Sequence, residues 1–116
     1  MKAPPASDWD FSSIAELTTA LRSRRMSASE LLDSVIARIE ALDQRINAVV
    51  VRDFDRAKDA AKAADAALAR GEDRPLLGIP VTLKEPFNVV GLPTTWAFQE
   101  FRDFVPNEDA LAVSRL

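Results

Sequence analysis

The feature that most restricts the fold is a pair of helix start signals near the N-terminus. Capping boxes of the form Ser-x-x-Glu begin at Ser13 and at Ser27. In each, the serine can accept an N–H group of the first turn while the glutamate accepts the serine's own N–H. Apolar residues at helical spacing follow both boxes, most clearly over residues 31–42. We therefore expect a helical lead over residues 12–44, packed as an αα-hairpin.

The next segment, residues 48–70, is expected to hold a short strand and a helix. The run at 48–51 contains three successive valines, which favour a strand because β-branched side chains lose rotamer freedom in a helix. Alanine dominates residues 57–69, and Gly71 is suited to end that helix. No chemistry-bearing group stands out in this helix, which we interpret as a spacer.

Residues 77–97 read as a strand followed by a loop. Apolar residues alternate with others from Ile79 to Leu83, which predicts a half-buried strand with Lys84 at its C-terminal end. A Gly-Leu-Pro-Thr-Thr loop begins at Gly91. From composition alone Lys84 has no assigned role, and a solvated lysine is the ordinary alternative.

The sequence of this block resembles that of the amidase signature family, with G-I-P-V-x-x-K-E from Gly78 followed by G-L-P-T-T-W from Gly91. The segments Ile39–Asp43 and Ile46–Val49 resemble the lead-in helices of the same family. The resemblance implies an α/β fold in which a helical hairpin precedes the first strands and helices of a mixed sheet. It also implies that Lys84 is the catalytic base of a Ser–cis-Ser–Lys triad.

The other members of that triad are missing from this sequence. None of its eight serines follows a glycine, and its three glycines are too scattered to form an oxyanion nest. Glu85 beside the lysine is interpreted as a structural hydrogen-bonding residue, and Thr94 and Thr95 as residues that order their loop. The family commonly has a glycine soon after the double threonine, where this chain has Trp96.

The last residues predict a helix that is cut short. Asn107 is a good N-cap, acidic residues follow it, and apolar residues recur at helical spacing up to Leu116. We therefore expect a truncated helix over 107–116, and we interpret residues 1–116 as the N-terminal part of one amidase domain.

Composition limits the remaining classes of function. A net charge of −3 lacks the basic surface that nucleic-acid binding requires, and the absence of cysteine and histidine removes disulfides, zinc-finger ligands and His-based triads. No apolar run is long enough for a membrane span. We expect a cytoplasmic protein with no metal, no cofactor, no nucleic-acid partner and no membrane partner.

Together these features predict part of a hydrolase that cleaves carbon–nitrogen bonds other than peptide bonds in a small-molecule amide. The chain alone is expected to be inactive, because it holds only Lys84 of the triad. Within the family, one alternative is a protein similar to the amidase-type component of glutamyl-tRNA amidotransferase. Another alternative is a non-enzymatic helical module or remnant, forming a homo-oligomer through Ile14–Leu21 and Leu31–Leu42.

Overall fold

The computed structural model describes residues 7–116, which divide into two compact units. The first unit ends at Pro80, and the second comprises Val81–Leu116. No helix within residues 7–116 is long and apolar enough to cross a membrane.

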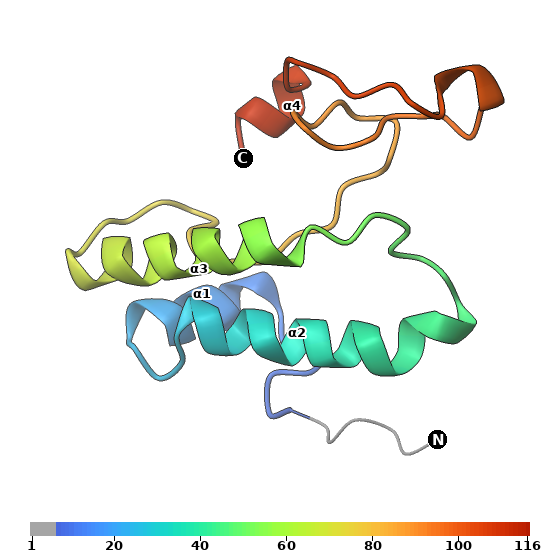
Figure 1. Ribbon diagram of the computed structural model, residues 1–116. Coiled ribbons are helices and arrows are strands. Elements are labelled where there is room, and N and C mark those ends of the chain that lie inside the picture. The colour runs from blue at the N-terminus through green and yellow to red at the C-terminus, as the bar shows by residue number, and fades with distance from the viewer. Residues whose placement is uncertain (1–6) are drawn as a thin grey trace. The chain divides into compact units, whose positions relative to one another are not determined.

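The first unit contains three α-helices, α1 (Ile14–Arg22), α2 (Ala28–Leu42) and α3 (Phe54–Ala69), with a 3-10 turn, η1 (Asp43–Arg45), after α2 (Figure 1). Both predicted capping boxes are formed. Ser13 caps α1 and Ser27 caps α2, and in each box the glutamate three residues on accepts the serine's N–H. Gly71 ends α3 as predicted, with φ +80° and its N–H donated to Leu68.

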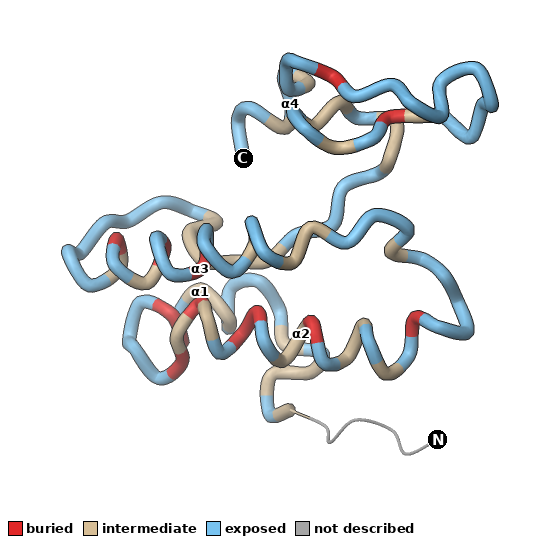
Figure 2. The backbone as a smooth tube through the Cα atoms, viewed as in Figure 1, coloured by how far each residue is buried: buried red, intermediate tan, exposed pale blue. Residues whose placement is uncertain are grey.

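The core of this unit lies between α2 and α3, which run antiparallel and form the main helix pair (Figures 1 and 2). Ala61 and Ala64 are buried on α3, and their small side chains allow the two helices to approach closely. Helix α1 joins the same core through Ala20 and Leu21. Both helices of the predicted hairpin are therefore formed, but α2 packs mainly against α3 and not against α1. In the apolar stripes proposed as an oligomer surface, four residues are buried in this core: Leu21, Leu31, Leu32 and Ile36.

Helix α3 also contributes a polar contact that the sequence did not reveal. The Asp65 carboxylate accepts the N–H groups of Ala28 (2.6 Å) and Ser29 (3.1 Å) and the Ser29 hydroxyl (2.6 Å). These N–H groups belong to the first turn of α2, where a helix has no internal acceptor for them. Asp65 thus ties the end of α3 to the start of α2.

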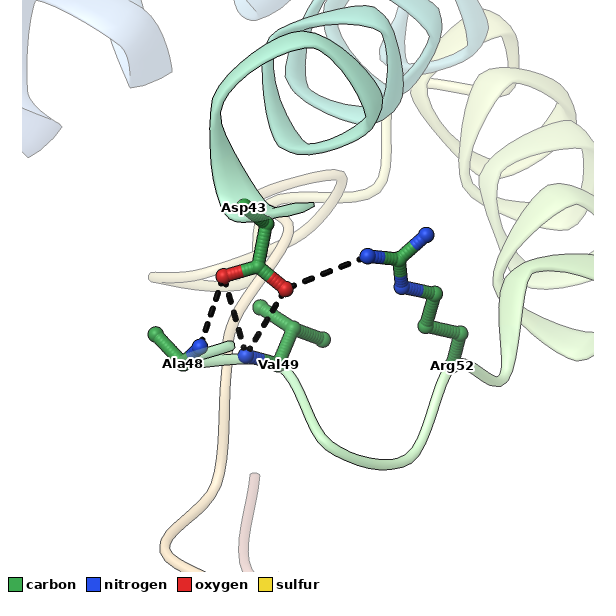
Figure 3. A network of polar contacts seen from close by, with 4 residues as sticks. All are labelled: Asp43, Ala48, Val49 and Arg52. Atoms are coloured by element: carbon green, nitrogen blue, oxygen red, sulfur yellow. Dashed lines mark hydrogen bonds and ion pairs between the residues drawn. The ribbon is translucent and has the colours of Figure 1, made fainter. Parts of the chain in front are cut away.

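A second carboxylate, Asp43, organises the connection between α2 and α3 (Figure 3). Asp43 is only 5% exposed. It accepts the N–H groups of Ala48 (2.7 Å) and Val49 (3.2 Å) and pairs with the Arg52 guanidinium (3.2 Å). The Ala48 N–H in particular lowers the pKa of Asp43 below its ordinary value. The chain reversal after α2 is therefore fixed by an ionised side chain.

Neither predicted strand is formed in the part of the chain that the structure describes. Residues 48–51 and 79–84 have irregular backbone, which corrects the local prediction. A strand needs a neighbouring strand to take up its N–H and C=O groups. At 48–49 the N–H groups go to Asp43 instead, and Pro80 has no N–H to offer. The mixed sheet implied by the family resemblance stays a prediction.

The second unit consists mainly of two chain segments that run antiparallel without forming regular strands. The N–H groups of Gly91 and Thr94 donate to Pro106 (3.3 Å) and Phe104 (3.1 Å). Ala110 donates its N–H to Asn88 (2.9 Å). Thr94 is 1% exposed, so its side chain lies inside this small unit.

The unit also contains a 3-10 turn, η2 (Gln99–Phe101), and a final short helix, α4 (Leu111–Ser114). The helix predicted over 107–116 is therefore wrong about its start, and Asn107 is not its N-cap. The reason is tertiary. The Asp109 carboxylate accepts the Val90 N–H (2.7 Å) and Ala110 donates its N–H to Asn88, so contacts with the antiparallel segment hold Ala110 in an extended conformation, with ψ 144°.

Candidate functional site

Lys84 lies near the beginning of the second unit, in a turn. Its carbonyl accepts the N–H of Phe87 (3.0 Å), which closes a turn over residues 84–87. The residue is exposed. Within residues 7–116 its ammonium group forms no hydrogen bond or ion pair. The lysine is therefore an exposed side chain. It lies at the end of an irregular segment, where the sequence predicted a strand.

Glu85 has the role that the sequence suggested. Its Oε1 accepts the N–H of Thr95, and its Oε2 accepts the N–H of Trp96 (3.0 Å). The Thr95 N–H is the main reason that the pKa of Glu85 is lowered, and the neighbouring Lys84 charge acts in the same direction. The carboxylate is thus a structural hydrogen-bond acceptor, which confirms the prediction.

The loop after the double threonine has a backbone that L-residues rarely adopt. Trp96 and Ala97 have φ values of 53° and 59°, both in the left-handed region. The Ala97 N–H donates to Thr95 Oγ1 (3.2 Å), which confirms that Thr95 orders the loop. For Thr94, the bond that the structure shows comes from its backbone N–H and not from its hydroxyl. The missing family glycine is thus replaced by two strained residues.

The serines are mostly engaged in local structure. Ser13 and Ser27 are helix caps, as predicted, and Ser29 donates to Asp65. In the second unit the single serine, Ser114, donates its hydroxyl to Leu111 (2.9 Å) within α4. The side chains of these four serines are therefore used within their own units.

Two open cavities of the first unit are lined by residues of that unit alone. Each cavity has a volume of about 310 Å³, and Lys84 lines neither. Within residues 7–116 no cluster of three or more carboxylate, histidine or cysteine side chains could hold a metal ion. What the described residues bring together is one exposed cation and one carboxylate-held loop. Chemically, this arrangement can offer a group that transfers protons.

The sequence model of the family "Amidase" matches residues 30–116. The chain belongs to the amidase family, whose members carry the amidase signature. The resemblance inferred from the residues around Lys84 is thereby confirmed.

Similar proteins include components of glutamyl-tRNA(Gln) amidotransferases. The protein from Gluconobacter oxydans (strain 621H) is 40% identical over 107 residues, covering 92% of this chain and 21% of the relative. The protein from Aromatoleum aromaticum is 42% identical over 104 residues, covering 90% and 21%. The chain thus spans about a fifth of the length of the curated relatives it matches.

Solved structures show the same fold over most of the chain. One is described as an unexpected vestigial protein complex that reveals the evolutionary origins of an s-triazine catabolic enzyme. It is similar with a TM-score of 0.85 and 33% identity, over 90% of this chain and 23% of that one. An inhibitor-bound form of that complex gives a TM-score of 0.83. The arrangement of helices and loops in this chain is therefore shared with a larger protein.

Proposed function

We propose that this chain contributes the lysine base of an amide hydrolase, with Lys84 as its catalytic residue. The observation that carries the proposal is that, among residues 7–116, the Lys84 ammonium forms no hydrogen bond or ion pair, while both oxygens of the adjacent Glu85 are taken by backbone N–H groups. Within residues 7–116, Glu85 therefore holds its loop and forms no ion pair with the lysine. Family membership supplies the class of reaction, hydrolysis of a carbon–nitrogen bond.

The proposed reaction is acyl transfer through two serines that lie outside these 116 residues. One serine oxygen forms a bond to the amide carbonyl carbon, and its proton passes through the second serine to the neutral Lys84 amine. The carbon–nitrogen bond then breaks as the relay returns that proton to the leaving amine. Water attacks the resulting ester and releases the acid. A lysine side chain accepts a proton only in its neutral form, which low-polarity surroundings favour.

The proposed substrate is a small-molecule amide, and the chemistry needs neither a metal nor a cofactor. We propose a cytoplasmic location for the protein. The matches to amidotransferase components, at 40% and 42% identity, support a narrower second candidate, in which the complete protein hydrolyses an amide to supply ammonia. Trp96 after the double threonine supports a stand-alone amidase instead. A homo-oligomer through α1 and α2 stays a prediction. The exposed apolar surface that these two stripes offer is small, because Ile14 and Leu42 are their exposed apolar residues.

The test of the reaction class uses the protein expressed from its complete coding sequence. It is incubated with a 4-nitroanilide, or with glutamine for the second candidate, in the presence of hydroxylamine. Acyl transfer through a covalent ester predicts a hydroxamate product in addition to the acid. The isolated 116-residue chain, which lacks the nucleophile, should give neither product. Absence of hydroxamate from an active complete protein, or amide turnover by the isolated chain, would contradict the proposal.

A further inference from the structure

We propose that Glu85 is a positioning residue that fixes the backbone of Lys84 against the loop of residues 94–98. The proposal deepens the proposed function and rests on it for the role of Lys84. Its structural content, a carboxylate that joins two segments ten residues apart, is independent of any activity. We call this arrangement the Glu85 clamp, defined as Glu85 with the N–H groups of Thr95 and Trp96.

The loop that the clamp holds has a partner for every one of five successive backbone N–H groups. Thr94 donates to Phe104, and Phe98 donates to the Thr95 carbonyl (2.9 Å). Ala97 donates to Thr95 Oγ1, while Thr95 and Trp96 donate to Glu85. Two of the five acceptors are therefore the oxygens of one side chain. Removing that side chain would leave two adjacent N–H groups without an acceptor inside the unit.

These two bonds lie next to the strained part of the loop. Trp96 and Ala97 are both left-handed, a conformation that costs an L-residue of this kind free energy. Such strain persists only where the surroundings hold it in place. Bonds from N–H groups to an ionised carboxylate are stronger than those to a neutral acceptor. The charge of Glu85 is therefore suited to keeping the loop in this conformation.

The same carboxylate restrains the chain on the other side of the clamp. Glu85 follows Lys84 directly, and the Lys84 carbonyl accepts the Phe87 N–H. The backbone around the lysine is thus held at two points, by the turn and by the clamp. A general base must be placed closely with respect to the group it deprotonates, and a displacement of an ångström can greatly slow the reaction.

The alternative role for Glu85 is that of a proton-transferring partner of Lys84. Both of its oxygens already accept N–H groups, and those bonds lower its pKa. A carboxylate with a lowered pKa is a weaker base and is rarely protonated near neutrality. The geometry therefore favours positioning over proton transfer.

The first test is NMR on the 116-residue chain. The Thr95 and Trp96 amide signals should move together on acidification, with a midpoint below the ordinary glutamate value of 4.5. Glu85→Gln should abolish that titration and speed exchange of both amides by about tenfold or more. The Phe87 amide should also exchange faster. Glu100→Gln, the same change at an exposed glutamate of η2, is the matched control. Amides that ignore pH, or that exchange as before in Glu85→Gln, would overturn the clamp.

The second test separates positioning from a purely structural role in the complete protein. Glu85→Gln should lower kcat by about 10- to 100-fold with little change in KM, and Glu85→Asp should restore part of the loss. Glu100→Gln should behave as wild type. An unchanged kcat in Glu85→Gln, with the NMR clamp confirmed, would show that the clamp does not position Lys84. If the complete wild-type protein hydrolyses no amide, the proposed function fails, and the clamp is judged by NMR alone.

Discussion

Replacing Asp65 by alanine should clearly destabilise the first unit. The substitution removes three hydrogen bonds, two of them from N–H groups in the first turn of α2. It leaves the buried alanines of α3 unchanged. The effect therefore reports on the polar contact between the two helices and not on their packing.

The magnitude follows from the two terms that the carboxylate supplies. Loss of a side-chain cap costs about 0.5–2 kcal/mol. Loss of a negative charge at a helix N-terminus costs about 0.3–1 kcal/mol more. We therefore expect a decrease of about 1–3 kcal/mol in the free energy of unfolding, or roughly 5–20 °C in Tm for a unit of this size. Asp65→Asn keeps one acceptor oxygen and should lose about half as much.

The assay is urea unfolding of the 116-residue chain, followed by helical circular dichroism. Asp59→Ala on the same helix is the control, since Asp59 is exposed and, within residues 7–116, pairs only with Lys62 at 3.6 Å. That change should cost less than about 0.5 kcal/mol. A double-mutant cycle with Ser29→Ala should show coupling between the two residues. If Asp65→Ala is no more destabilising than Asp59→Ala, the interhelical cap contributes nothing and the reasoning is refuted.

Four further substitutions test the backbone and the buried carboxylate. Gly78→Ala should cost about 1–3 kcal/mol in urea unfolding, since its φ is +82° and the new Cβ would lie 3.0 Å from a side chain of α2. Gly71→Ala, with φ +80° but nothing within 4 Å, should cost about 1 kcal/mol, and equal costs would contradict the steric argument. The pKa of Asp43 is lowered from its ordinary 3.8, mainly by the Ala48 N–H, so its stabilisation is present above that value and lost as the pH falls through the folded-state pKa. Asp43→Asn should therefore flatten the acid side of the stability curve, and an unchanged slope in an acid titration would refute this. Ala97→Gly removes one left-handed alanine, with φ 59°, and should raise stability by about 0.5–1 kcal/mol in thermal unfolding; a decrease would show that the strain is absent.

The parts of the fold that could be predicted are those set by neighbouring residues. The caps at Ser13 and Ser27, and the helix end at Gly71, each depend on groups within four or five positions along the chain. Such local bonds are visible in the sequence as fixed spacings. Glu85 was also interpreted correctly as a hydrogen-bonding residue, although its partners at Thr95 and Trp96 could not be named.

What could not be predicted depends on partners far along the chain. Asp65 looked like one of several surface charges on a spacer helix, and only the antiparallel packing of α2 and α3 brings it to Ala28. Asn107 has the right neighbours for an N-cap, but Asp109 accepts an N–H of the antiparallel segment and Ala110 donates its own N–H to that segment, which holds the stretch in an extended conformation. Tertiary contacts override a local propensity that is worth only fractions of a kcal/mol per residue, as a rough guide.

In the candidate site, too, one feature could be predicted from the sequence and another could not. Lys84 was singled out by a resemblance that the family match over residues 30–116 confirms, but its role remains proposed. The strand expected to carry it is absent from the described residues, since the alternation over residues 79–84 has no partner strand with which to pair. An alternating pattern indicates which face of a strand would be buried, but it does not show whether a neighbouring strand is present to pair with it.

The most direct test of the central claim compares two lysine substitutions in the complete protein. Lys84→Met removes the amine while keeping a long side chain, and Lys58→Met makes the same change at an exposed lysine of α3. The quantity to measure is kcat for hydrolysis of a small aryl amide, with unfolding curves to show that both variants are folded. We predict that Lys84→Met lowers kcat by at least about 10²-fold, while Lys58→Met keeps the wild-type rate. A folded Lys84→Met variant that hydrolyses the amide at the wild-type rate would contradict the assignment of Lys84 as the base.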